Sequence, residues 1–176
     1  MKTVLALVCC LSIVSVPALA QKEKKGASNA PMTDQQFVDF AAQTDMMEAN
    51  LGQLAGNAAS SQAVKDYAQM LVTDHTADYK QLGDVAKQAN LNLPNAIDEE
   101  HNKMIAPFQK LKGAAFDKKY ETEMVAGHTK AIAIYQKEAS DAQNSGLKSY
   151  AQQALTVLQK HLDGAKDLGK SKAAAK

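Results

Sequence analysis

Apolar residues recur every three or four positions along most of the chain from residue 33 onward, which is the spacing of amphipathic helices. The first helix is expected from Thr33, which forms a capping-box pattern with Gln36, to residue 58. A second is expected after Ser60-Ser61 and ends near Asn90. Two more are expected on either side of a turn at Asn144-Ser145-Gly146, and each long helix spans roughly 35–43 Å.

A shorter helical pattern covers residues 96–112, includes Pro107 and ends at Gly113. Four amphipathic helices of matched length, arranged as two tight hairpins, are typical of a helical bundle. The sequence therefore predicts an all-α, four-helix bundle over residues 33–168, with its two long hairpins joined by a short fifth helix.

Composition supports this fold class and excludes one class of partner. Apolar residues make up 45% of the 176-residue chain, aromatic residues only 5%, and Trp is absent. A shortage of β-branched and aromatic residues disfavours a sheet. All 20 basic residues are Lys and the net charge is +1, so we expect no nucleic-acid partner, which would favour a basic excess with Arg.

The first 20 residues have the pattern of a cleavable secretory signal. Lys2 precedes an apolar stretch that is too short to span a membrane, and Ala18-Leu19-Ala20 is a cleavage motif. Residues 21–32 are expected to form a flexible leader and residues 169–176 a disordered tail. Both cysteines lie within the signal, so we expect an exported chain without thiols or a membrane span. The periplasm is the favoured location; secretion or association with an outer membrane is the alternative.

Four polar residues share the apolar faces of the four long helices near their midpoints: Glu48, His75, His128 and His161. Counted from the two hairpin turns, they differ in depth by only ~8 Å along the helix axis, so they are expected in one layer. Asp78, three residues after His75, is expected nearby. The fourth histidine, His101, follows acidic residues that complement a helix dipole, and this role accounts for it.

Imidazole and carboxylate groups converging in a bundle have two interpretations. One is a site for one divalent transition metal (Zn, Fe, Mn or Cu), held by Glu48, His75, Asp78, His128 and His161. Asp74 or Asp78 would then be a further ligand or would accept a hydrogen bond from an imidazole. The other is a structural network in which these histidines bond to neighbouring carboxylates and Tyr hydroxyls.

Six motifs in the same order resemble the exported domain-of-unknown-function family 4142. They are Leu51-Gly52-Gln53-Leu54-Ala55, Met70-Leu71-Val72-Thr73-Asp74-His75, Leu93-Pro94, Phe116-Asp117-Lys118-Lys119-Tyr120, Met124-Val125-Ala126-Gly127-His128 and His161-Leu162-Asp163-Gly164-Ala165. The resemblance covers residues 33–168. It implies a ferritin-like bundle, in a family often labelled as outer-membrane proteins, and implies no settled activity.

Ferritin-like di-iron enzymes use two Glu-x-x-His pairs, and this sequence contains none. The residues three positions before His75, His128 and His161 are Val72, Val125 and Leu158. A di-iron oxidase is therefore disfavoured, and the sequence has no signature of nucleophilic catalysis either.

Three functions stay open at this point. The first is a non-enzymatic envelope protein that binds an unidentified protein or small ligand, with a role in envelope stress. The second is binding or buffering of a divalent metal at the histidines. The third is a carrier for a small apolar ligand, because Met47, Met70 and Met124 are flexible enough to adapt to a guest.

Overall fold

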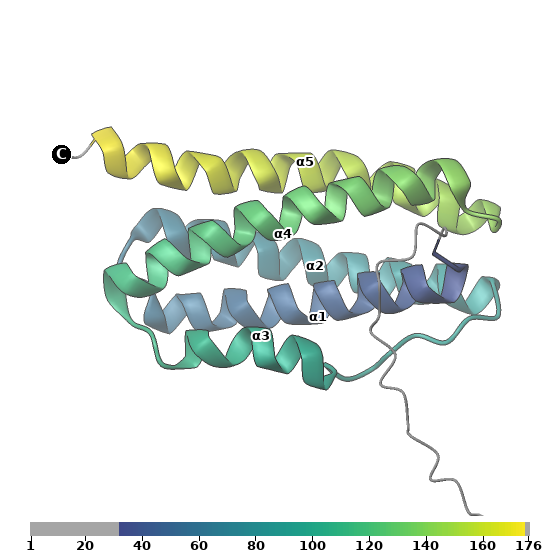
Figure 1. Ribbon diagram of the computed structural model, residues 1–176, viewed down its shortest axis with the longest axis horizontal. Coiled ribbons are helices and arrows are strands. Elements are labelled where there is room, and N and C mark those ends of the chain that lie inside the picture. The colour runs from purple at the N-terminus through teal and green to yellow at the C-terminus, as the bar shows by residue number, and fades with distance from the viewer. Residues whose placement is uncertain (1–31, 175–176) are drawn as a thin grey trace, which may run out of the picture. The chain divides into compact units, whose positions relative to one another are not determined.

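The computed structural model describes residues 32–174, which form five helices (Figure 1). The helices are α1 (Asp34–Ala58), α2 (Gln62–Gln88), α3 (Glu99–Gln109), α4 (Gly113–Asp141) and α5 (Ser145–Ala174). The all-α architecture and the two long hairpins joined by a short helix are confirmed. The predicted signal at residues 1–20 and all of the predicted leader except Met32 lie outside the described residues.

Local capping explains where the first hairpin begins and turns. Thr33 accepts a hydrogen bond from the backbone N–H of Gln36, and the Gln36 side chain accepts one from the Thr33 backbone, so the predicted capping box is present. At the turn after α1, the buried carboxylate of Asp117 accepts hydrogen bonds from the Ser60 and Ser61 backbone and from the Ser60 hydroxyl. This carboxylate ties the start of α4 to the first hairpin.

The two helices of this first hairpin approach closely at Gly52. A Cβ there would lie 2.6 Å from Val72 Cγ2 and 2.8 Å from the backbone oxygen of Ala68. Only glycine fits this position without displacing α2, whose backbone cannot yield as a flexible side chain does. The close approach brings residues on facing turns of α1 and α2 within hydrogen-bonding reach of one another.

Three helix boundaries differ from the expectation, at both ends of the short helix and at the end of α5. The short helix begins at Glu99 rather than residue 96, because Asp98 caps it by accepting from the backbone N–H of His101, and it ends at Gln109 with Pro107 inside it. Helix α5 continues past Gly169 to Ala174, where a disordered tail was expected. An ion pair between Lys170 and Asp167, one turn apart, and the high helix propensity of Ala and Lys favour this continuation.

The long helices pack in the cyclic order α1, α2, α5, α4, and α3 lies against α1 and α4. Two separate apolar clusters fill the interior. One contains Met47, Leu71, Met124 and Ala165, and the other contains Phe37, Leu82, Ala131 and Leu158. Within the described residues, no helix is long and apolar enough to cross a membrane.

Candidate metal centre

A buried polar layer separates the two apolar clusters. His75 lies on α2 between Leu71 of one cluster and Leu82 of the other, and His128 and His161 occupy equivalent places on α4 and α5. Glu48 follows Met47 on α1. All four side chains are buried, as the helical spacing predicts for polar residues on apolar faces.

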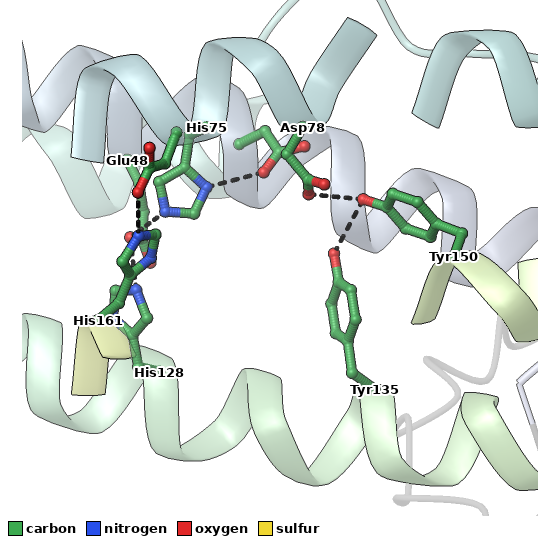
Figure 2. A network of polar contacts seen from close by, with 9 residues as sticks. Glu48, His75, Asp78, His128, Tyr135, Tyr150 and His161 are labelled. Carbon is green, nitrogen blue, oxygen red and sulfur yellow. Dashed lines mark hydrogen bonds and ion pairs between the residues drawn. The ribbon is translucent and has the colours of Figure 1, made fainter. Parts of the chain in front are cut away.

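The four side chains converge from four different helices (Figure 2). One ligand atom from each of His75, His128 and His161 lies within 4.8 Å of the others. The carboxylate oxygen Glu48 Oε2 lies 3.0 Å from His75 Nε2 and 3.3 Å from His128 Nε2. We call these four residues the imidazole cluster.

Each imidazole also has an outer partner, and the partner fixes which nitrogen faces the cluster. His75 Nδ1 lies 2.8 Å from Asp45 Oδ1, and His128 Nδ1 lies 2.9 Å from the Met124 carbonyl oxygen. A carbonyl oxygen can only accept, so His128 Nδ1 carries the hydrogen and its Nε2 has the lone pair. The same assignment at His75 makes Nδ1 the donor to the Asp45 carboxylate.

His161 presents the opposite ring nitrogen to the cluster from His75 and His128. Its Nε2 lies 2.9 Å from Asp74 Oδ2, so the hydrogen that is donated to the carboxylate sits on Nε2 and the lone pair is on Nδ1. In the described residues, His75 Nε2, His128 Nε2, His161 Nδ1 and Glu48 Oε2 are buried and have no partner with regular hydrogen-bond geometry. Glu48 Oε2 has ion-pair contacts to His75 Nε2 and His128 Nε2 only. All four atoms face the cluster interior, and each can donate a lone pair.

The charges in the cluster are opposite in sign and stabilise one another. Burial alone would raise the pKa of Glu48, but the neighbouring imidazoles of His128 and His75 lower it below its usual value. Burial alone would lower the pKa of His75, but the Glu48 carboxylate and the hydrogen bond to Asp45 hold it well above 6.5. These pKa shifts favour the cationic form of His75, paired with the Glu48 carboxylate whose Oε2 lies 3.0 Å from His75 Nε2.

The other two titratable neighbours behave differently. Burial lowers the pKa of His161 to about 4, although its bond to Asp74 acts in the opposite direction. His161 is thus neutral at neutral pH, with its lone pair available. Burial raises the pKa of Asp45 to about 7, against the effect of its bond to His75.

The predicted ligand Asp78 is not brought into the imidazole cluster. It is one turn beyond His75 on α2, and its carboxylate accepts a hydrogen bond of 2.6 Å from the Tyr150 hydroxyl (Figure 2). Tyr135 lies next to it, with its hydroxyl 3.4 Å from that of Tyr150. His101 is also outside the cluster, because its Nδ1 lies 2.8 Å from the capping Asp98.

Asp45 is a residue of the site that the sequence reasoning missed. It precedes Glu48 by three residues, so it lies one turn away on the same face of α1, and that spacing was a usable signal. Asp74, which was considered as an acceptor, does bond to His161. Carboxylate–imidazole pairs of this kind orient metal-binding histidines and raise their basicity.

These observations test whether the residues suit a metal ion. Three neutral-imidazole nitrogens and one carboxylate oxygen are a donor set typical of Zn, Cu and Fe sites. Their inward-facing atoms have no regular hydrogen bond, while the opposite ring nitrogens are held from outside. A purely structural network would be expected to satisfy these buried atoms. The residues therefore fit a single transition-metal ion.

Known proteins resemble the chain in fold and in family. A solved structure titled "CopM in the Cu(II)-bound form" matches 81% of this chain and 99% of its own, with a TM-score of 0.67 and 14% sequence identity. That likeness shows the helical-bundle fold. Among curated proteins, no sequence matches. Residues 18–168 match the family described as "Domain of unknown function (DUF4142)", and the chain therefore belongs to this family.

Proposed function

We propose that the protein binds one divalent transition-metal ion at the imidazole cluster and acts as a metal-binding or metal-buffering protein. The observation that carries the proposal is the convergence of four buried, inward-facing atoms, His75 Nε2, His128 Nε2, His161 Nδ1 and Glu48 Oε2, none of which has regular hydrogen-bond geometry in the described structure. Glu48 Oε2 has only ion-pair contacts, to His75 Nε2 and His128 Nε2, and His161 Nδ1 has no hydrogen-bond partner. Leaving a buried polar atom such as His161 Nδ1 without a hydrogen bond costs about 1–3 kcal/mol. A metal ion would be bound by all four inward-facing atoms at once.

Cu(II) and Zn(II) are the ions that this donor set favours. Imidazole nitrogen suits both ions, and Cu(II) forms the strongest complexes of the divalent first-row series. CopM, which has a similar fold, was solved with Cu(II), and this likeness makes Cu(II) the first ion to test. The bound ion would hold four helices together and would be sequestered from solvent, because all four ligand residues are buried.

The position of the site in a cell follows from the proposed export. If residues 1–20 are a secretory signal, the cluster would hold its ion in the cell envelope. The absence of cysteine from residues 21–176 suits an oxidising compartment, since histidine and carboxylate ligands are not lost by oxidation to disulfides. We therefore combine the metal site with the hypothesis of a non-enzymatic envelope protein, and propose that the protein handles metal ions during envelope stress.

Metal titration of purified, tag-free protein tests the proposal. We expect calorimetry to show one equivalent of Cu(II) or Zn(II) bound with micromolar or tighter affinity, roughly −8 kcal/mol or more favourable. His128→Ala removes a ligand and is expected to weaken binding at least about tenfold. Binding weaker than millimolar in the wild-type protein would contradict the proposal and leave the cluster as a structural network.

The fourth histidine provides a matched control. His101 is paired with Asp98 at the start of α3 and does not belong to the cluster. His101→Ala should therefore leave the affinity and stoichiometry unchanged, within about twofold. Equal losses in His101→Ala and His128→Ala would indicate non-specific binding to histidine side chains.

A further inference from the structure

A cleft of about 310 Å³ lies between α2 and α5. His75 and His161, two members of the imidazole cluster, line it, together with the exposed Ala77 of α2. The other two members, Glu48 and His128, come from α1 and α4, and both are almost completely buried. The cleft therefore lies against the cluster on the side that α2 and α5 form, with the buried His75 and His161 in its wall.

The carboxylates that orient the histidines differ in their access to solvent. The Asp74 side chain, which holds His161, is 30% exposed and lines the cleft, whereas the Asp45 side chain, which holds His75, is 2% exposed. Asp78 also lines the cleft, and Lys160 is the basic residue among its lining. The partly exposed Asp74 carboxylate in a confined cleft attracts cations and raises the rate at which they arrive.

A buried metal site needs a path by which the ion can enter. We propose that the α2–α5 cleft is the route through which the metal ion reaches and leaves the imidazole cluster, with Asp74 as the positioning residue that holds His161 at the inner end of this route. The inference rests on the proposed function, because it concerns access to the same site. In this arrangement Asp74 has two roles: its charge attracts the cation, and its hydrogen bond keeps His161 Nδ1 directed toward the cluster.

Partial obstruction of the cleft gives the first test. Ala77→Phe adds a ring at an exposed position of the cleft wall, two residues from His75. Obstructing a route raises the barrier without changing the free or bound state, so association and dissociation should slow by the same factor, about tenfold, with Kd unchanged. Association is measured by stopped-flow quenching of Tyr fluorescence by Cu(II), since the chain has five Tyr and no Trp. Dissociation is measured by the recovery of this fluorescence after excess chelator is added to trap the released ion.

The chain offers a closely matched control on another helix. Ala126 on α4 is also exposed and also lies two residues from a cluster histidine, His128. Ala126→Phe should leave both rates at the wild-type values. Wild-type rates in Ala77→Phe, or equal slowing in both variants, would overturn the proposed route.

Asp74→Asn gives a second, independent measurement. The amide keeps an oxygen that can accept from His161 Nε2 but removes the charge, so we expect a several-fold lower association rate that depends less on salt. Asp66→Asn, at an exposed position of α2 outside the cleft lining, should change neither quantity. An unchanged association rate in Asp74→Asn would contradict the role of Asp74. Wild-type protein that binds no metal would instead refute the proposed function, so the two failures are distinguishable.

Discussion

Two polar layers, one buried and one partly open to solvent at Asp78, lie side by side in this bundle, and they differ in how their polar atoms are satisfied (Figure 2). In the tyrosine layer, made of Asp78, Tyr135 and Tyr150, the Tyr150 hydroxyl donates to Asp78 and lies within hydrogen-bonding distance of the Tyr135 hydroxyl. In the imidazole cluster, none of the inward-facing atoms has regular hydrogen-bond geometry in the described structure, and Glu48 Oε2 has only ion-pair contacts to His75 Nε2 and His128 Nε2. Burial of polar residues alone does not identify a ligand site; the direction of their unused lone pairs does.

The two layers also differ in charge. Burial raises the pKa values of Tyr135 and Tyr150 far above their usual values and also raises the pKa of Asp78, so the tyrosine layer disfavours charge. In the imidazole cluster the neighbouring groups lower the pKa of Glu48 and raise that of His75, so charges of both signs are favoured. A cation can replace the proton of His75 in the cluster, whereas the tyrosine layer offers no equivalent exchange.

The largest expected effect is stabilisation by metal. A ligand that binds only the folded state at 1,000 times its Kd adds about 4 kcal/mol to the free energy of unfolding. We expect this increment for Cu(II) or Zn(II) in the wild-type protein and in Tyr150→Phe. In His128→Ala, a tenfold weaker affinity lowers the increment to about 2.7 kcal/mol at the same metal concentration, and a greater loss of affinity lowers it further. Urea unfolding with and without metal measures this increment in the free energy of unfolding. If Tyr150→Phe and His128→Ala lost the same increment, both layers would be required for metal binding.

The carboxylate behind His75 should produce the next largest effect. Asp45→Asn keeps an acceptor for His75 Nδ1 but removes the charge that raises the basicity of the ring, so affinity should fall about 10- to 100-fold. Competition titration at pH 8 measures it, because Asp45, with a pKa of about 7, is ionised there.

Asp78→Asn is the matched control for this carboxylate. The amide oxygen can still accept from the Tyr150 hydroxyl, and Asp78 lies in the tyrosine layer, so Kd should stay within about threefold of wild type. A larger loss of metal affinity would indicate that Asp78 is a ligand, as its spacing from His75 predicts.

The proton on His75 predicts how affinity depends on pH. The pKa of His75 is raised in the folded protein, so this proton stabilises the metal-free state below pH 6.5, and the stabilisation is lost as the pH rises through the folded pKa. The ion must displace this proton, and His161, with a pKa of about 4, contributes none near neutrality. Affinity should therefore rise with pH below the folded pKa of His75, by about tenfold per pH unit for each proton displaced, with at least one proton released per ion. Calorimetry in buffers of different ionisation enthalpy counts the protons; an affinity independent of pH would contradict this account.

The sequence predicted the helices and the imidazole cluster because both follow from helical periodicity. His75, His128 and His161 share an apolar face and a common depth, and these two quantities suffice to place them in one layer. The expected depth was measured from the hairpin turns, which the structure has close to the expected positions.

Side-chain direction within a layer could not be predicted in the same way. Asp78 and Asp45 are both three residues from a cluster member, but only Asp45 turns toward His75, while Tyr150 takes the carboxylate of Asp78. The partner of each carboxylate depends on which residue of a neighbouring helix faces it, and the helical spacing does not give this. The nitrogen that each histidine presents depends on outer partners from other helices as well, as with Asp74 and His161.

The smallest expected effect comes from the tyrosine layer itself. Tyr150→Phe removes the donor to Asp78, whose half-buried carboxylate loses its hydrogen bond but can be reached by water, so the metal-free protein should lose about 1 kcal/mol of stability. Urea unfolding of chelator-treated protein measures the loss. Metal affinity should change by less than about twofold, because Tyr150 contacts no cluster atom directly. A loss of affinity larger than the loss of stability would mean that Asp78 acts on His75 through charge, and that the ion is held by both layers.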